Sequence, residues 1–170
     1  GRKTAHAVLA FRFPRHFQGA RPRAGERFPR AGPSRRIGGK MIQGNLEGIR
    51  QSILDELEKL YDAQFARDEY LPDRLLNALV RFTMQLNREL LVYLDRNGVV
   101  LEIAVGSISS ISLPELHLRR NLDRLSGYRC IHTHPGGDAR LSDVDLQALR
   151  LLRFDSMCSV GVAENRATGI

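Results

Sequence analysis

YRCIHTHPGGDARLSDVD, residues 128–145, predicts a strand, a sharp turn and a helix in direct succession. Residues 128–134 are typical of a strand, and Pro135-Gly136-Gly137-Asp138 would end it abruptly. Ser142 is a favourable N-cap residue, and a leucine-rich helix is expected over 144–153. Such a strand-loop-helix unit would return the first turn of the helix to the end of the strand.

The same stretch contains two histidines and an aspartate at spacings suited to one metal ion. His132 and His134 are two residues apart, so on a strand they project from the same face. Asp145 lies in the first turn of the expected helix and supplies a third ligand. Three protein ligands with a fourth position left for water are typical of catalytic zinc sites, whereas structural sites are closed by four. The residues therefore predict a catalytic zinc site.

Two further side chains are candidates for catalysis. Water activated by zinc needs a base, and Glu89, which opens an expected strand, is the best candidate, with an exposed strand-end carboxylate as the alternative. Ser142 would donate a hydrogen bond to the oxyanion, although N-capping alone also accounts for it. Asp145 could merely complement the helix dipole. Cys130, two residues before His132, is either a fourth ligand or a small core residue.

Upstream of this stretch, the spacing of apolar residues changes from helical to strand-like. Apolar residues at intervals of three and four predict amphipathic helices over 46–60 and from Pro72 to Met84, which together would form a helical hairpin. A β-hairpin is expected over 89–105, because Asn97-Gly98 tolerates the positive φ values of a tight turn. We expect an irregular segment over 106–126 and a last strand over 157–162, and hence an α/β fold.

Charge divides the chain into two unequal parts. Its 170 residues suit one domain of ordinary size, with a formal net charge of +7. Residues 1–40 hold 11 Lys and Arg against one acidic residue, and residues 41–170 hold 15 against 18. The first 40 residues have no helical or alternating period and are predicted to be disordered. They are either a basic arm for RNA or DNA phosphates, or leader residues outside the native domain.

Cysteine content and hydropathy indicate the compartment. Cys130 and Cys158 are the two cysteines of the chain, too few for a disulfide framework. No stretch approaches the roughly 18 uninterrupted apolar residues that span a membrane. We therefore expect a cytoplasmic protein with no membrane partner.

The run His132-Thr133-His134-Pro135, with Ser142 and Asp145, reads H-x-H-x7-S-x2-D. It matches the motif of JAMM (MPN+) zinc metallo-isopeptidases and resembles their RadC-like branch, over about residues 88–162. The resemblance implies an α/β, cytidine-deaminase-like sandwich around a mixed sheet, with flanking helices. It also implies peptide or isopeptide substrates. In that family a glutamate at the start of the first strand is the general base, which corresponds to Glu89 here.

Residues 41–170 as a whole resemble the N-terminal extension of HflX-type bacterial GTPases. The shared stretches are LNRE (86–89), VYLDRNG (92–98), SLPE (112–115), RLSGYRCIHTHPGG (124–137) and LSDVDL (141–146). Proteins of that family bind GTP and associate with the ribosome. This chain has no G-x-x-x-x-G-K-[ST] to hold GTP phosphates, so GTP binding would belong to a GTPase domain beyond Ile170.

These features predict three segments: a basic prefix (1–40), a helical leader (41–87) and a RadC/JAMM-like domain (88–170) that is expected to continue past Ile170. The expected function is zinc-dependent hydrolysis of amide or isopeptide bonds, within the N-terminal region of an HflX-like ribosome-associated GTPase. The alternative is a non-catalytic accessory module that docks the GTPase domain or the ribosome. Nucleic-acid binding by the prefix is a third possibility.

Overall fold

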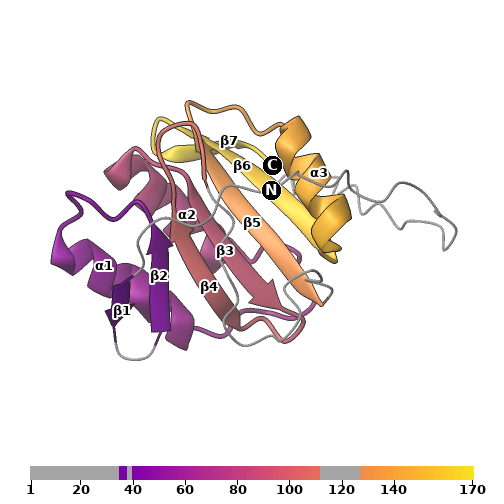
Figure 1. Ribbon diagram of the computed structural model, residues 1–170, viewed down its shortest axis with the longest axis horizontal. Coiled ribbons are helices and arrows are strands. Elements are labelled where there is room, and N and C mark those ends of the chain that lie inside the picture. Colours follow the sequence, from indigo (N-terminus) through magenta and orange to yellow (C-terminus); the bar gives the residue numbers. More distant parts are fainter. Residues whose placement is uncertain (1–34, 38–39, 112–126) are drawn as a thin grey trace, which may run out of the picture.

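A mixed β-sheet with helices on both faces forms the body of the protein (Figure 1). The computed structural model describes residues 35–37, 40–111 and 127–170. Among these residues, seven strands lie in the order β1-β2-β4-β3-β5-β6-β7. The strands are β1 (Arg35–Ile37), β2 (Lys40–Gly44), β3 (Leu90–Asp95), β4 (Val100–Val105), β5 (Tyr128–Pro135), β6 (Ser156–Ala163) and β7 (Arg166–Gly169). The helices are α1 (Gln51–Glu58), the 3-10 helix η1 (Lys59–Asp62), α2 (Asp73–Leu86) and α3 (Asp143–Leu152).

Successive side chains along a strand point to opposite faces of the sheet, so the apolar core is divided into two clusters, one on each face. In β3, Leu90 and Val92 belong to the cluster that packs against α1 and α2, whereas Leu91 and Tyr93 belong to the cluster under α3. Both faces are therefore covered by helices, and all five residues of β3 from Leu90 to Leu94 are buried. A strand buried on both sides is expected at the centre of a layered α/β sheet.

The elements around residues 128–145 lie close to where the sequence predicted them. β3 and β4 form the antiparallel hairpin, β5 is followed by α3, and β6 contains the expected last strand. The parallel pairing of β6 with β5 was not predicted. The prediction of an α/β protein with a mixed sheet and flanking helices is confirmed. In the hairpin turn, only Gly98 of the Asn97-Gly98 pair has positive φ, at +80°. Asp95 completes the turn, since its carboxylate accepts hydrogen bonds from the amides of Asn97 and Val99.

The region before β3 differs from the prediction. The expected helix over 46–60 begins only at Gln51, because β2 occupies the sheet beside β4 and the chain leaves it through Gly44, at φ +96°. A Cβ at Gly44 would lie 2.1 Å from the carbonyl oxygen of Val105, so only glycine fits there. The predicted helical leader therefore begins with a strand of the main sheet.

The predicted helical hairpin is also modified. α1 and α2 lie on the same face of the sheet and are joined by an ion pair of 2.7 Å between Arg81 and Glu56. η1 and residues 63–72 separate them, and α2 packs on β5, β6 and β7. The two helices thus cover the sheet, and they do not precede it as a separate unit.

Both ends of the described chain add strands that were not predicted. Residues 35–37 and 40 fall in the segment predicted to be disordered, yet they belong to β1 and β2. The tail, for which no element was expected, contains β7 at the other edge of the sheet. The remainder of the predicted disordered prefix, and residues 112–126 of the irregular segment, lie outside the described residues.

Candidate metal centre

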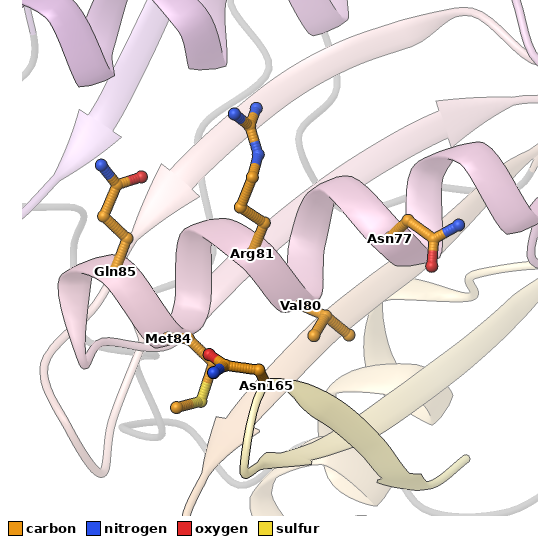
Figure 2. Close-up of a pocket in the computed structure, with 6 residues that line it drawn as sticks. All are labelled: Asn77, Val80, Arg81, Met84, Gln85 and Asn165. Atoms are coloured by element: carbon orange, nitrogen blue, oxygen red, sulfur yellow. The ribbon is translucent and has the colours of Figure 1, made fainter.

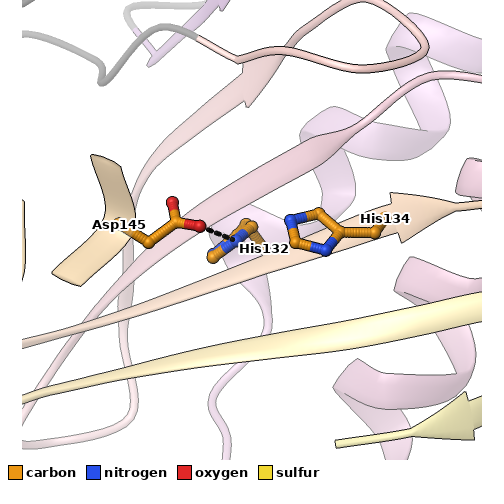
Figure 3. A group of neighbouring side chains, drawn as sticks. All are labelled: His132, His134 and Asp145. Atoms are coloured by element: carbon orange, nitrogen blue, oxygen red, sulfur yellow. Dashed lines mark ion pairs between the residues drawn. The ribbon is translucent and has the colours of Figure 1, made fainter. Parts of the chain in front are cut away.

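Three candidate ligands converge where β5 ends and α3 begins. His132 and His134 project from the same face of β5, and Asp145 reaches them from the first turn of α3 (Figure 3). One ligand atom from each residue lies within 4.8 Å of the others. Nε2 of His132 is 3.5 Å from Oδ2 of Asp145. The strand-loop-helix unit therefore brings together the three residues that spacing had selected, and this group could hold a metal ion.

The chemistry of His132 fits a metal ligand. Its side chain is only 1 % exposed, and neither ring nitrogen has a hydrogen-bond partner among the described residues. A buried polar atom without a partner costs about 1–3 kcal/mol, so such atoms are rare in folded proteins. A cation between His132 and Asp145 would satisfy Nε2, because a neutral imidazole nitrogen donates its lone pair to a metal.

His134 is oriented by the loop after β5 and by β6. Its Nδ1 lies 2.9 Å from the carbonyl oxygen of Asp138 and 3.1 Å from Oγ of Ser159. A carbonyl oxygen only accepts, so this bond requires a proton on Nδ1 and leaves the lone pair of Nε2 for a ligand. Arg140 in turn holds the Asp138 carboxylate with several hydrogen bonds, the shortest 2.7 Å. These bonds stabilise the loop after β5 at the residue whose carbonyl orients His134.

Glycines allow this loop to pack closely. Gly136 and Gly137 adopt φ values of +96° and +91°, which other residues rarely reach. The carbonyl oxygen of Gly137 accepts a hydrogen bond of 2.6 Å from Thr168 of β7. A Cβ at Gly161 of β6 would lie 2.3 Å from that same carbonyl oxygen. Only glycine at position 161 therefore lets the loop approach β6.

Ser142 fixes the carboxylate of Asp145. Its hydroxyl and its main-chain amide donate hydrogen bonds of 2.6 and 2.8 Å to Oδ2, and its oxygen accepts from the Asp145 amide at 3.2 Å. These contacts form a capping box at the N-terminus of α3. Burial disfavours the ionised carboxylate, but the interaction with His132 and the bonds from Ser142 outweigh it and hold the pKa of Asp145 well below its usual range. Asp145 is thus an anion suited to bind a cation.

Glu89 lies beside this cluster, one residue before β3. It is only 7 % exposed, and its main chain is bonded to the segment after β4, from Glu89 N to Ser107 O and from Gly106 N to Glu89 O, each at 2.8 Å. Burial raises the pKa of Glu89 to about 7, with His134, when its ring is protonated, opposing the shift and the Asp145 carboxylate reinforcing it. Its carboxyl group is therefore electrostatically coupled to two of the candidate ligands.

No family model, curated protein or solved structure matches the chain. The assignment of this site therefore depends on its own geometry. The described helices include none that is both long and apolar enough to cross a membrane.

Two of the sequence-based roles need to be refined. The hydroxyl of Ser142 donates its single proton to Asp145, so in this structure Ser142 caps α3 and orients a candidate ligand. Cys130 is fully buried in the core under α3, and burial raises its thiol pKa well above the usual range. Cys130 is also outside the group of candidate ligands. It is therefore placed as a core residue.

Other residues at the site were not foreseen. Ser159 and the carbonyl of Asp138 orient His134, and Thr133 contacts α2 on the opposite face of the sheet. A main-chain carbonyl leaves no signature in a sequence. Ser159 is brought to β5 by the parallel pairing of His132 with Ser159, which follows from the register of the sheet.

A groove of about 590 Å³ lies elsewhere, along α2 (Figure 2). Its lining combines side chains of α2 with one from the turn between β6 and β7: Asn77, Val80, Arg81, Met84, Gln85 and Asn165. None of the candidate metal ligands contributes to it.

Proposed function

We propose that this chain is a zinc-dependent hydrolase of amide or isopeptide bonds, with His132, His134 and Asp145 as the zinc ligands. The single observation that carries the proposal is the approach of the three ligand atoms to within 4.8 Å, with Nε2 of the buried His132 facing Oδ2 of Asp145 at 3.5 Å and no hydrogen bond to either ring nitrogen of His132 among the described residues. Two imidazoles and one carboxylate are the donor set of many catalytic zinc sites. Three ligands leave a coordination position for the reaction.

Zinc in such a site acts as a Lewis acid, which acidifies water and polarises a carbonyl group. The chain would then supply the proton transfers. Glu89 would take a proton from the attacking water and return it to the leaving amine. A general base works best when its pKa lies near the working pH, and the pKa of Glu89 is raised to about 7. This match supports the role of Glu89 as base and then acid.

Ser142 would contribute through Asp145. Its two hydrogen bonds to Oδ2 fix the carboxylate, and ligands held in this way bind metals more tightly. For Ser142 also to stabilise an oxyanion, as its place in the motif suggests, its hydroxyl would have to rotate away from Asp145 when substrate binds.

The proposal is tested by hydrolysis assays on zinc-loaded protein with a panel of peptide and isopeptide substrates. Glu89→Gln should reduce the rate by about 100-fold or more, the usual contribution of general acid–base catalysis. Glu102→Gln is the matched control. Glu102 is also 7 % exposed with a pKa raised to about 7, chiefly by burial, but it lies on β4 and bonds to Gln43. Equal rates for wild type and Glu89→Gln would contradict the proposed mechanism.

The wider context remains a proposal from resemblance. An HflX-like GTPase domain that binds GTP, and the ribosome, would be partners of this chain. Zinc-loaded protein that folds normally and hydrolyses no substrate would favour the accessory module, in which the domain docks one of these partners.

A further inference from the structure

Thr133 lies between the two candidate histidine ligands but faces the other side of the sheet. It is completely buried, and its Oγ1 is 2.6 Å from Oγ1 of Thr83, a buried residue of α2. The two hydroxyls form a polar contact within the apolar core between α2 and the sheet. Buried polar groups that are hydrogen-bonded fix one arrangement of the elements that carry them.

The same hydroxyl also reaches β3. The amide of Leu90 donates a hydrogen bond of 3.0 Å to Oγ1 of Thr133. Main-chain pairing of β3 with β5 extends only as far as Leu91 and His132. The side chain of Thr133 thus takes up the next amide of β3 where the ladder ends. Because this hydroxyl accepts from Leu90, its own proton is available for Thr83.

This contact acts directly beside Glu89. The main chain of Glu89 is held from the β4 side by Ser107 and Gly106, and Leu90 is held from the β5 side by Thr133. The start of β3 is therefore fixed from both sides. Without the Thr133 contact, the bonds to the segment after β4 would remain, but Leu90, next to Glu89, would lose its contact with β5, whose main-chain pairing with β3 begins only at Leu91.

We infer that the Thr83–Thr133 hydroxyl pair positions Glu89 relative to the two histidines, and so couples the base of the reaction to helix α2. The inference rests on the proposed function, in which Glu89 acts on water at the metal. Thr133 and Thr83 are positioning residues, since their hydroxyls act through Leu90 and touch neither metal nor substrate. Catalysis depends on such placement, because a displacement of about 1 Å can reduce a rate roughly 100-fold.

The variants Thr133→Val and Thr133→Ser distinguish a positioning role of the Thr133 hydroxyl from a purely structural one. Valine keeps the branched shape but removes the acceptor, whereas serine keeps the hydroxyl. The first measurement is hydrogen exchange of the Leu90 amide in metal-free protein. The second is the absorption spectrum of the cobalt-substituted protein across pH, which reports the surroundings of the metal. Glu89→Gln and His134→Ala provide the reference spectra.

We expect Thr133→Val to raise the exchange rate of the Leu90 amide by about tenfold or more. It should keep stoichiometric cobalt and reproduce the altered pH dependence of Glu89→Gln, while Thr133→Ser should match wild type in both measurements. If Thr133→Val does not fold, Thr83→Val should show the same cobalt signature with a smaller effect on Leu90.

Unchanged exchange at Leu90, a wild-type cobalt spectrum in Thr133→Val, or cobalt loss like that of His134→Ala would each overturn the inference. Failure of Thr133→Ser to restore the wild-type behaviour would do the same. Wild-type protein that binds no cobalt would instead refute the proposed metal site. In that case the inference about catalysis fails with it, and exchange at Leu90 still decides whether Thr133 holds the strand.

Discussion

Nε2 of His132 lies 3.5 Å from Oδ2 of Asp145, although the two residues belong to different elements, β5 and α3. Each is held in place by separate contacts, His132 by burial in the sheet and Asp145 by the capping box of Ser142. Contacts between protein atoms therefore bring an imidazole and a carboxylate together. A site organised by such contacts would lose little conformational entropy on taking up a metal.

Replacement of His134 or of Asp145 should greatly reduce metal binding. We expect purified wild-type protein to hold about one zinc per chain, and His134→Ala and Asp145→Asn to hold much less, because two remaining protein ligands are too few for a stable zinc site. Elemental analysis after dialysis measures this. Asp143→Asn is the matched control, since Asp143 is an exposed residue in the same turn of α3. Zinc content that is equal in all four proteins would place the metal elsewhere.

The two buried carboxyl groups should make the metal-free protein less stable as pH rises. The pKa values of Glu89 and Glu102 are raised to about 7, so between about 4.5 and 7 the folded protein binds more protons than the unfolded chain. The free energy of unfolding then falls across this range. Relative to wild type, Glu89→Gln should gain roughly 1–3 kcal/mol on going from pH 4 to pH 8. Urea denaturation in the presence of a chelator measures the difference.

The exposed Glu47 provides the control for that experiment. Glu47→Gln should show the same pH dependence as wild type. A Glu89→Gln variant whose advantage over wild type is the same at both pH values would show that Glu89 ionises in the folded protein as it does in the unfolded chain.

Local patterns in the sequence were sufficient to predict the centre of the fold and the grouping of the three candidate ligands. The period of two in β5 puts His132 and His134 on one face, and the N-cap at Ser142 sets where α3 starts, so Asp145 follows within one turn. Both signals act over a few residues. The hairpin of β3 and β4 was predicted for the same reason.

The missed strands depend on partners far away in the chain. β2 pairs in parallel with β4, with Ile42 opposite Ile103, and its five residues show no alternation that identifies a strand. β7 is a short edge strand with the exposed Arg166, and it forms by pairing with β6. Ser159 escaped notice similarly, because its contact with His134 arises from the β5–β6 register.

Loss of the Ser142 hydroxyl should weaken both the fold and the metal site. Ser142→Ala removes the cap of α3 and should lower the free energy of unfolding by about 1 kcal/mol. It also releases one of the two bonds to Oδ2 of Asp145, so zinc affinity should fall by about 10- to 100-fold, as for other groups that orient metal ligands. Chelator competition measures the affinity. Ser142→Thr keeps the hydroxyl and should retain both properties, and wild-type affinity in Ser142→Ala would show that Asp145 does not need this contact.

The approach of the Gly136–Gly137 loop to β6 gives the last prediction. Alanine at position 161 would place its Cβ 2.3 Å from the carbonyl oxygen of Gly137, a main-chain atom that cannot rotate away. The loop would have to move, and with it the Asp138 carbonyl that orients His134. We expect Gly161→Ala to lose several kcal/mol of stability and at least tenfold in zinc affinity. Gly136→Ala is the comparison, because its Cβ would meet no atom within 4 Å and the variant bears only the strain of φ +96°.

Denaturation and chelator competition on both variants separate crowding from strain. Gly136→Ala should lose roughly 1–2 kcal/mol, the usual cost of a left-handed conformation for a residue with a Cβ, with little change in affinity for zinc. Gly161→Ala should lose affinity out of proportion to its stability, because the displaced carbonyl no longer fixes the Nδ1 proton of His134. If both variants lose affinity equally, the loop acts on the site through its backbone conformation, and its contact with β6 is not what holds His134.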